Sequence, residues 1–172
     1  MNRSCIQNLK RRGDDNPLDF LWYELDDILH DKITFVVMIA KYKNELIIIR
    51  NRNREVWELP GGRREEGEFI IETASRELYE ETGSIIFELS PLGIYAFHDS
   101  YGMAFYAEVE EIDELPESEI AEIRLIKSLP EGLNYGEVYY KMYERLDLVR
   151  RTNKGLKTYK INYMDRSAKY EF

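Results

Sequence analysis

Three glutamates, Glu77, Glu80 and Glu81, stand at positions i, i+3 and i+4 of a segment with helical spacing. Each residue of an α-helix turns by about 100°, so these carboxylates share one face. Like charges at this spacing repel, and the C-terminal end of a helix disfavours anions. This arrangement suggests a bound cation, and Mg²⁺ prefers a few carboxylates combined with substrate phosphates. Taken alone, three such glutamates more often form a solvated acidic face without a ligand, so the residues around them decide between the two.

The spacing around these glutamates forms a longer pattern. A glycine is followed by five residues, a glutamate, seven residues, Arg-Glu, an aliphatic residue, one residue, Glu-Glu, one residue and a glycine. The fixed positions are Gly62, Glu68, Arg76, Glu77, Leu78, Glu80, Glu81 and Gly83. This pattern resembles the signature of the Nudix hydrolases, here of MutT-like type, which hydrolyse a nucleoside diphosphate linked to another group. One departure is Ser84, where the signature has an aliphatic residue.

The resemblance implies a fold and a set of roles. The expected fold class is α/β, or α+β, with a central mixed β-sheet in an α/β/α sandwich. Glu77, Glu80 and Glu81 would be catalytic and would bind Mg²⁺ or Mn²⁺, with the carbonyl of Gly61 as a further ligand. The general base would be Glu80 or Glu81, or else a glutamate from a loop. Structural roles fall to Gly62, Glu68, Arg76 and Gly83, with a salt bridge between Glu68 and Arg76 holding the helix to the loop.

Residues outside the helix are weaker candidates, each with a plain structural alternative. Glu117 and Glu119, followed by Glu122, are candidates for the base or an extra ligand, or else form a solvated acidic loop. Substrate-binding candidates are Arg63, Arg64 and Trp57. The two arginines would bind phosphates or balance neighbouring glutamates, and the tryptophan would stack on a base or pack in the core. His98 and Asp99 suggest an acid–base pair or a capped turn.

Composition bounds the class of protein. The chain has 172 residues, of which 44% are hydrophobic, and a net charge of −9. This length suits one domain with appendages. The acidic balance argues against nucleic-acid or membrane binding, because those partners call for a basic surface. A single cysteine, Cys5, fits a reducing compartment, and neither a secretory signal nor a membrane span is visible. We expect a soluble cytoplasmic protein, as a monomer or a homodimer.

Hydrophobic periodicity places the elements. Residues 18–31 predict a short helix or an extended arm, and Pro60-Gly61-Gly62 predicts a sharp turn. The predicted strands are 32–42, 46–51, 84–89, 91–99, 102–112 and 120–130, and the predicted helices are 68–82 and 137–151. Alternation at Tyr159, Ile161 and Tyr163 predicts a late strand or an ordered arm. The predicted organisation is an N-terminal extension (1–30), a catalytic domain (31–152) and a C-terminal tail (153–172) that packs on the domain.

The function expected from the resemblance is metal-dependent hydrolysis of a small nucleotide. The first expectation is conversion of an NTP or dNTP to NMP and pyrophosphate. An ADP-ribose, nucleotide-sugar or dinucleotide pyrophosphatase is the alternative, and residues 1–30 would then be a dimerising element. A third hypothesis is a non-catalytic nucleotide-sensing domain, against which the intact glutamate set argues.

Overall fold

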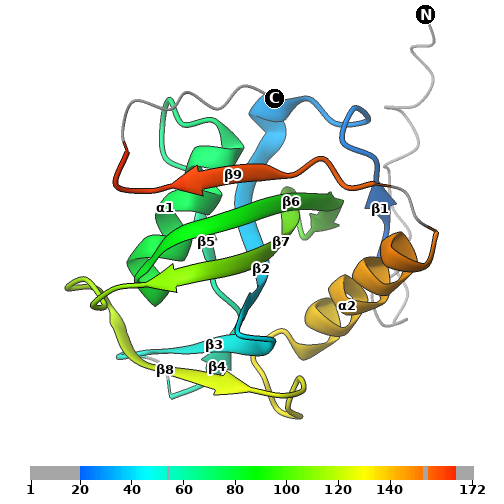
Figure 1. Cartoon of the computed structure of the whole chain (residues 1–172). Helices are drawn as coiled ribbons and strands as arrows, with labels where there is room; N and C mark the ends of the chain where they lie inside the picture. Colours follow the sequence, from blue (N-terminus) through cyan, green and yellow to red (C-terminus); the bar gives the residue numbers. More distant parts are fainter. Residues whose placement is uncertain (1–19, 54, 153–154, 166–172) are drawn as a thin grey trace, which may run out of the picture.

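One mixed β-sheet organises the part of the chain that the computed structural model describes, residues 20–53, 55–152 and 155–165. Its strands run in the order β1-β6-β7-β2-β3-β4, while β5 pairs with β2, β8 with β3, and β9 with β6. Two α-helices within this described part cover the sheet (Figure 1). The elements are β1 (Trp22–Tyr23), η2 (His30–Lys32), β2 (Ile33–Tyr42), β3 (Glu45–Asn51), β4 (Trp57–Glu58), β5 (Gly61–Arg63), α1 (Ile70–Thr82), β6 (Ser84–Phe97), β7 (Ser100–Ile112), β8 (Ile120–Ile126), α2 (Gly136–Arg151) and β9 (Tyr159–Asn162).

Strand β2 explains both the mixed character of the sheet and its two cores. It runs parallel to β7 and antiparallel to β3 and β5. Successive side chains of a strand point to opposite faces. Met38 accordingly packs in the cluster that contains α1 residues, and Ile39 packs in the cluster that contains α2 residues. The expected mixed sheet between helices is therefore confirmed.

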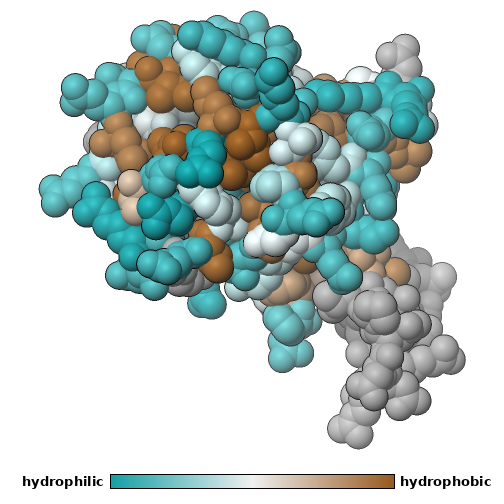
Figure 2. Space-filling view, turned by 90° about the horizontal axis from the view of Figure 1, so that it is seen from below, coloured by the Kyte–Doolittle hydropathy of each residue, from teal (hydrophilic) through white to brown (hydrophobic). Residues whose placement is uncertain are grey.

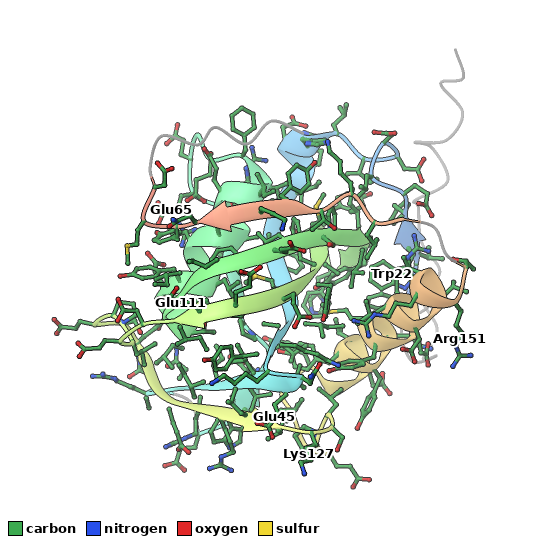
Figure 3. All side chains as sticks on the ribbon, viewed as in Figure 1. Trp22, Glu45, Glu65, Glu111, Lys127 and Arg151 are labelled. Atoms are coloured by element: carbon green, nitrogen blue, oxygen red, sulfur yellow. The ribbon has the colours of Figure 1, made fainter. Side chains whose placement is uncertain are left out.

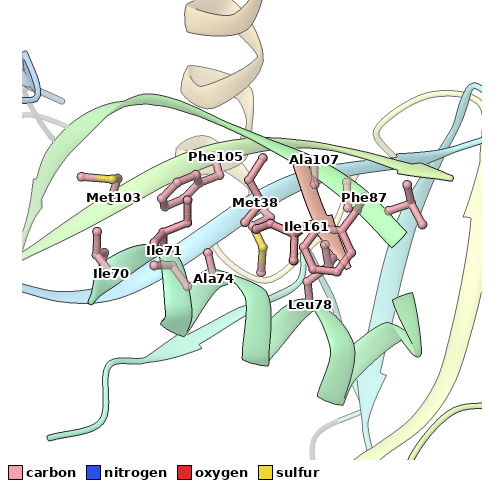
Figure 4. Close-up of a cluster of buried hydrophobic side chains, with 14 of the residues drawn as sticks. Met38, Ile70, Ile71, Ala74, Leu78, Phe87, Met103, Phe105, Ala107 and Ile161 are labelled. Carbon is pink, nitrogen blue, oxygen red and sulfur yellow. The ribbon is translucent and has the colours of Figure 1, made fainter. Parts of the chain in front are cut away.

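Helix α1 carries the predicted glutamates and is anchored by its apolar face. Ile71, Ala74 and Leu78 recur at helical spacing, have no exposed surface, and pack on the sheet (Figure 4). Burial of each of the two larger side chains contributes about 1.5–3 kcal/mol. The helix begins two residues later than predicted, because Phe69 is extended (φ −72°, ψ 150°) and donates its N–H to the Glu72 carboxylate at 2.7 Å.

The end of α1 depends on Gly83. This residue adopts φ 72° and donates its N–H to the carbonyl of Tyr79 at 2.8 Å, as a glycine C-cap does. A Cβ atom at Gly83 would lie 2.7 Å from the carbonyl oxygen of Asp113. The glycine therefore serves both the helix end and the close approach of the segment that follows β7.

Two predicted strands, 84–89 and 91–99, are one continuous strand in the structure. β6 spans Ser84–Phe97 and pairs with β7 through a hairpin whose turn is His98 and Asp99. Pro91, the first residue of the second predicted strand, lies where the register shifts between Pro91 and Gly93. A β-bulge tolerates a residue that lacks an N–H donor, so the strand continues through it.

Three other boundaries differ from the predictions. Residues 18–31 form no α-helix where described, but a two-residue strand and the short η2 turn, close to the extended-arm alternative. Pro60-Gly61-Gly62 is not only a turn, because Gly61–Arg63 pairs with β2 as β5. The predicted strand 120–130 ends at Ile126.

The chain ends that the structure describes lie on the same strand, β6. Trp22 and Tyr23 of β1 pair with one part of β6, and β9 pairs with another. Trp22 contacts the Tyr95 ring edge-on at 5.7 Å, and the guanidinium of Arg145 in α2 lies 5.5 Å from the Trp22 ring. Figure 3 shows Trp22 beside α2. The predicted late strand is thus present, while residues 1–19 and 166–172 lie outside the described part. No helix among the described residues has the length and apolarity of a membrane span.

Candidate active site

The motif loop reaches α1 through a strand that holds two glycines. β5 aligns Gly61 with Val37 and Gly62 with Val36 of β2. A Cβ atom at Gly61 would overlap the carbonyl oxygen of Val36, and one at Gly62 would overlap the carboxylate of Glu77. Only glycine allows this approach. Gly62 thus gives the Glu77 side chain its place against the loop.

Arg76 connects the loop to the helix. Its guanidinium forms two bonds to the Glu68 carboxylate, Nε–Oε1 at 2.7 Å and Nη2–Oε2 at 3.1 Å. Nη2 also donates to the carbonyl of Arg63 at 2.9 Å. Nη1 donates to Glu77 at 2.8 Å and to Glu80 at 3.0 Å. The predicted salt bridge between Glu68 and Arg76 is present, and the same arginine partly neutralises two motif glutamates.

The electrostatics separate Glu68 from the other glutamates. Burial alone would raise the pKa of Glu68. Hydrogen bonds from Arg76, the backbone N–H of Glu65 and the Thr73 hydroxyl outweigh that effect and lower the pKa to about 2. The pKa of Arg76 is raised, first by its hydrogen bonds to Glu68. Glu68 is therefore an ionised structural anchor and has the wrong pKa for a base at neutral pH.

Glu81 has the opposite environment. Burial raises its pKa to about 9, against a hydrogen bond from the Gly61 N–H at 2.8 Å. The negative charges of Glu77, Glu58 and Glu119 contribute to this raised value. The pKa of Glu77 is also raised, first by burial, although Arg76 opposes the shift. Several carboxylates are thus close together at the end of α1, and Arg76 alone does not neutralise their negative charge.

Glu58 was missed by the sequence reasoning. It is 8% exposed on β4, accepts a hydrogen bond from the side-chain amide of Asn134, and its charge acts on Glu81. It also raises the pKa of the buried Tyr139 of α2, after the larger effect of burial. An acidic residue between Trp57 and Leu59 in an otherwise apolar strand is the local signal that could have identified it.

The three loop glutamates that were candidates for the base or an extra metal ligand lie in different surroundings. The charge of Glu119 acts on Glu81, and its carbonyl accepts the Arg52 N–H at 2.7 Å. Glu117 is exposed, two residues before it. Glu122 is paired with Arg50 at 3.0 Å and Arg124 at 2.8 Å, which lower its pKa. Glu119 is therefore the loop glutamate that the fold brings toward the motif helix.

The substrate-binding candidates have structural contacts of their own. Arg64 donates to the carbonyls of Glu68 at 2.7 Å and His30 at 2.6 Å. Trp57 is half-buried, packs on the α2 side, and has the Arg124 guanidinium 4.3 Å from its ring centre. Both sets of contacts favour the structural alternative, while the side chain of Arg63 is exposed at the end of β5.

The donor set suits a hard cation. Glu77, Glu80 and Glu81 offer carboxylate oxygens at the end of one helix, and such oxygens are the ligands that Mg²⁺ prefers. Within residues 20–53, 55–152 and 155–165, no three carboxylates already converge as a metal cage. Glu77 and Glu80 instead contact Arg76, and Glu81 contacts Gly61. A divalent metal ion would replace some of these contacts and neutralise the carboxylates, so the three glutamates are suitable ligands for it.

Comparison with known proteins identifies the family. The NUDIX domain model matches residues 29–146, more than half of the chain, so the protein belongs to the Nudix family. A Bacillus subtilis protein described as a putative 8-oxo-dGTP diphosphatase is 32% identical over 59 residues. That alignment covers 34% of this chain and spans only 40% of the relative's length.

Solved structures share the fold. The Bacillus subtilis pyrophosphohydrolase BsRppH has a TM-score of 0.63 at 22% identity, covering 75% of this chain and 90% of that one. A Nudix hydrolase from Nitrosomonas europaea has a TM-score of 0.58 at 22% identity, covering 70% and 73%. At this identity the likeness concerns the architecture alone.

Gly62→Ala should displace the Glu77 carboxylate while leaving the core intact. The added methyl overlaps that carboxylate. We expect Mn²⁺ affinity, measured by electron paramagnetic resonance, to fall about 10- to 100-fold, with less than about 2 kcal/mol lost in the free energy of unfolding. Gly136→Ala is the matched control, since nothing lies within 4 Å of its Cβ position. Equal affinities in the two variants would contradict the assigned role of Gly62.

Glu81→Gln should stabilise the metal-free protein in a pH-dependent way. The pKa of Glu81 is raised from 4.5 to about 9. Its contribution to stability is therefore fully present below pH 4.5 and is lost as the pH rises through 9. Glutamine mimics the protonated acid, so the variant's advantage should grow from near zero at pH 4.5 to a few kcal/mol near pH 9. Urea unfolding with a chelator measures this difference. Glu144→Gln, on an exposed part of α2, should show none, and a pH-independent Glu81→Gln effect would refute the assignment.

Proposed function

We propose that this Nudix hydrolase converts a nucleoside triphosphate, NTP or dNTP, to NMP and pyrophosphate in a Mg²⁺-dependent reaction. The observation that carries the proposal is the buried carboxyl of Glu81, bonded to the Gly61 N–H and crowded by Glu77, Glu58 and Glu119. This site suits a polyanionic substrate only in company with a cation. In the overall reaction, water adds across the α–β phosphoanhydride, whose bridging P–O bond breaks.

The motif residues would hold the metal and handle the proton. Glu77, Glu80 and Glu81 would supply carboxylate ligands, together with the carbonyl of Gly61. When bound, Mg²⁺ neutralises phosphate charge and makes a bound water more acidic. Glu81, which bonds the Gly61 N–H and has no ion pair with Arg76, would be ionised once the metal is bound and is then the first candidate for the proton acceptor, with Glu80 as the alternative. Glu119 is the loop residue that could share this role, and Glu117 stays a weaker candidate.

Aromatic side chains support a substrate with a base. Phe35 of β2 lies beside Arg63 of β5 in the sheet register. Its ring contacts Phe97 at 6.2 Å, and Phe97 contacts Tyr135 at 5.6 Å. Tyr135 is 50% exposed and adopts φ 58°, an uncommon conformation for a residue with this side chain. An exposed ring held in this conformation offers a stacking surface to a nucleobase.

The similarity to a putative 8-oxo-dGTP diphosphatase supports the triphosphate substrate class. It concerns a 59-residue stretch, so the particular base is left to experiment. The alternative in which residues 1–30 are a dimerising element has less support, since Trp22 and Tyr23 pair with β6 of the same chain. ADP-ribose, nucleotide sugars and dinucleotides are therefore tested as alternative substrates.

Product analysis tests the proposal. The protein is incubated with Mg²⁺ and canonical or oxidised NTPs, ADP-ribose, nucleotide sugars or dinucleoside polyphosphates, and products are identified by mass spectrometry. We expect NMP and pyrophosphate from an NTP or dNTP. Glu80→Gln and Glu81→Gln should lower kcat at least about 100-fold, while Glu144→Gln should leave it unchanged.

Other outcomes have defined meanings. AMP and a sugar phosphate as the main products would replace the triphosphate proposal with the ADP-ribose or nucleotide-sugar alternative. Tight nucleotide binding without turnover of any substrate would favour the non-catalytic sensing domain. Full activity in both glutamine variants would remove the motif glutamates from the mechanism.

A further inference from the structure

Strand β8 (Ile120–Ile126) forms an edge of the sheet. It pairs with β3 from Ile126 to Glu122 and again at Ile120, with a register shift at Ala121, and within the described residues no strand pairs with its other side. In Figure 1 it is the lowest strand, and Figure 2 shows the underside of the molecule, where apolar and hydrophilic side chains are interspersed. An edge strand presents unpaired N–H and C=O groups, and proteins usually blunt such edges by short length, proline or bulges.

Of the devices that blunt an edge, β8 has one irregularity, the register shift at Ala121. The strand has seven residues and contains neither proline nor glycine. Leu125 is 38% exposed, and Ala121 is also exposed. The charged residues are Glu122 and Arg124, one of each sign. These two opposite charges would oppose pairing with another strand only in a register that places like charges opposite each other.

The sequence of β8 is complementary to itself. If two copies of the strand pair antiparallel about Ile123, Glu122 of each copy faces Arg124 of the other. The same register, continued through the irregularity at Ala121, places Ala121 opposite Leu125 and Ile120 opposite Ile126. Opposite charges and apolar residues are favourable cross-strand partners. The central Ile123 faces its own counterpart on the two-fold axis.

The complementarity continues beyond the strand. In the same register Glu119 faces Lys127, and Ser118 faces Ser128. Pro116 and Pro130 then stand opposite each other and end both sides of the segment. Lys127 lies at the lower edge of the molecule in Figure 3, directly after β8. A shift of register by one residue would break this pattern and turn every side chain to the other face.

From this complementarity we infer that β8 pairs with β8 of a second copy, so that the sheet continues across a two-fold axis. Such an interface is isologous, because each copy contributes the same surface. Within one copy, Glu122 already contacts Arg50 at 3.0 Å and Arg124 at 2.8 Å. The side chains of Glu122 and Arg124 retain 38% and 54% exposure, so they remain accessible to the other copy. The edge adjoins the candidate active site, since Glu119 precedes β8.

Charge reversal tests the pairing. Glu122→Arg and Arg124→Glu each create two like-charge contacts in the symmetric dimer. We expect sedimentation velocity, over protein concentrations up to about 1 mM, to show a dimer for the natural chain. Each single variant alone should dimerise about tenfold more weakly. An equimolar mixture of the two variants should recover the dimer, because one chain then presents two positive charges to the two negative charges of the other.

Native mass spectrometry of the mixture should show the mixed species in excess over either homodimer. A natural chain that stays monomeric throughout the series would overturn the inference. A mixture that dimerises no better than the separate variants would also overturn it. Circular dichroism of each variant verifies that its fold is retained, so that loss of the dimer is not confused with unfolding.

Cross-linking tests the register independently. In a chain with Cys5→Ser, Ile123→Cys should form an intermolecular disulfide, because the axis places this residue opposite itself. Ala121→Cys is the matched control. Its counterpart lies four residues along the strand, about 13 Å away, and a disulfide needs Cα atoms within about 7 Å. Equal cross-linking at both positions, or none at Ile123→Cys, would contradict the proposed axis.

Discussion

The site depends on one interaction, the contacts of the Arg76 guanidinium. This group reaches Glu68 and the Arg63 carbonyl in the loop, and Glu77 and Glu80 on the helix. Its side chain is only 17% exposed, so the ion pairs are screened less than surface pairs. Removal of one partner of such a network leaves buried charge uncompensated, which costs several kcal/mol. Arg76 thus makes it possible to gather carboxylates in one place.

Arg76 neutralises only part of the negative charge of the motif glutamates, and the remaining charge is what favours a bound metal ion. Arg76 contacts Glu68, Glu77 and Glu80 but not Glu81, whose hydrogen bond comes from Gly61. Glu81 is buried near Glu58 and Glu119, so the metal-free protein favours its protonated form. Crowding of carboxylates lowers the stability of the fold, and such destabilising arrangements are typical of functional sites. The rigid apolar face of α1 holds the helix in place despite it.

Much of this arrangement could be predicted from the sequence, because the motif and the helix obey local rules. The spacing of Ile71, Ala74 and Leu78 predicts the buried face of α1, and hence the glutamate face. The fixed pattern from Gly62 to Gly83 predicts the salt bridge of Arg76 with Glu68. The continuity of β6 was not predictable from local pattern, because Pro91 is tolerated only through its pairing with β7.

Long-range contacts account for what the sequence did not reveal. Glu58, Asn134 and Tyr139 come together only because the segment before α2 packs against β4. The same holds for Arg64, whose bonds to His30 and Glu68 could not be anticipated from the adjacent glutamates. A metal ligand or base that comes from another loop also depends on long-range contacts, so the sequence alone does not distinguish Glu119 from Glu117.

The most direct measurement is the number of protons released when Mg²⁺ binds at pH 7. Isothermal titration calorimetry in two buffers with different ionisation enthalpies gives this number. We expect a release of about one proton or more, because a carboxyl with a pKa of about 9 must ionise to become a ligand. Glu81→Gln should lose that release. Binding of Mg²⁺ by the natural chain without proton release would mean that Glu81 is already ionised beside Glu77, and the proposed protonated carboxyl would be wrong.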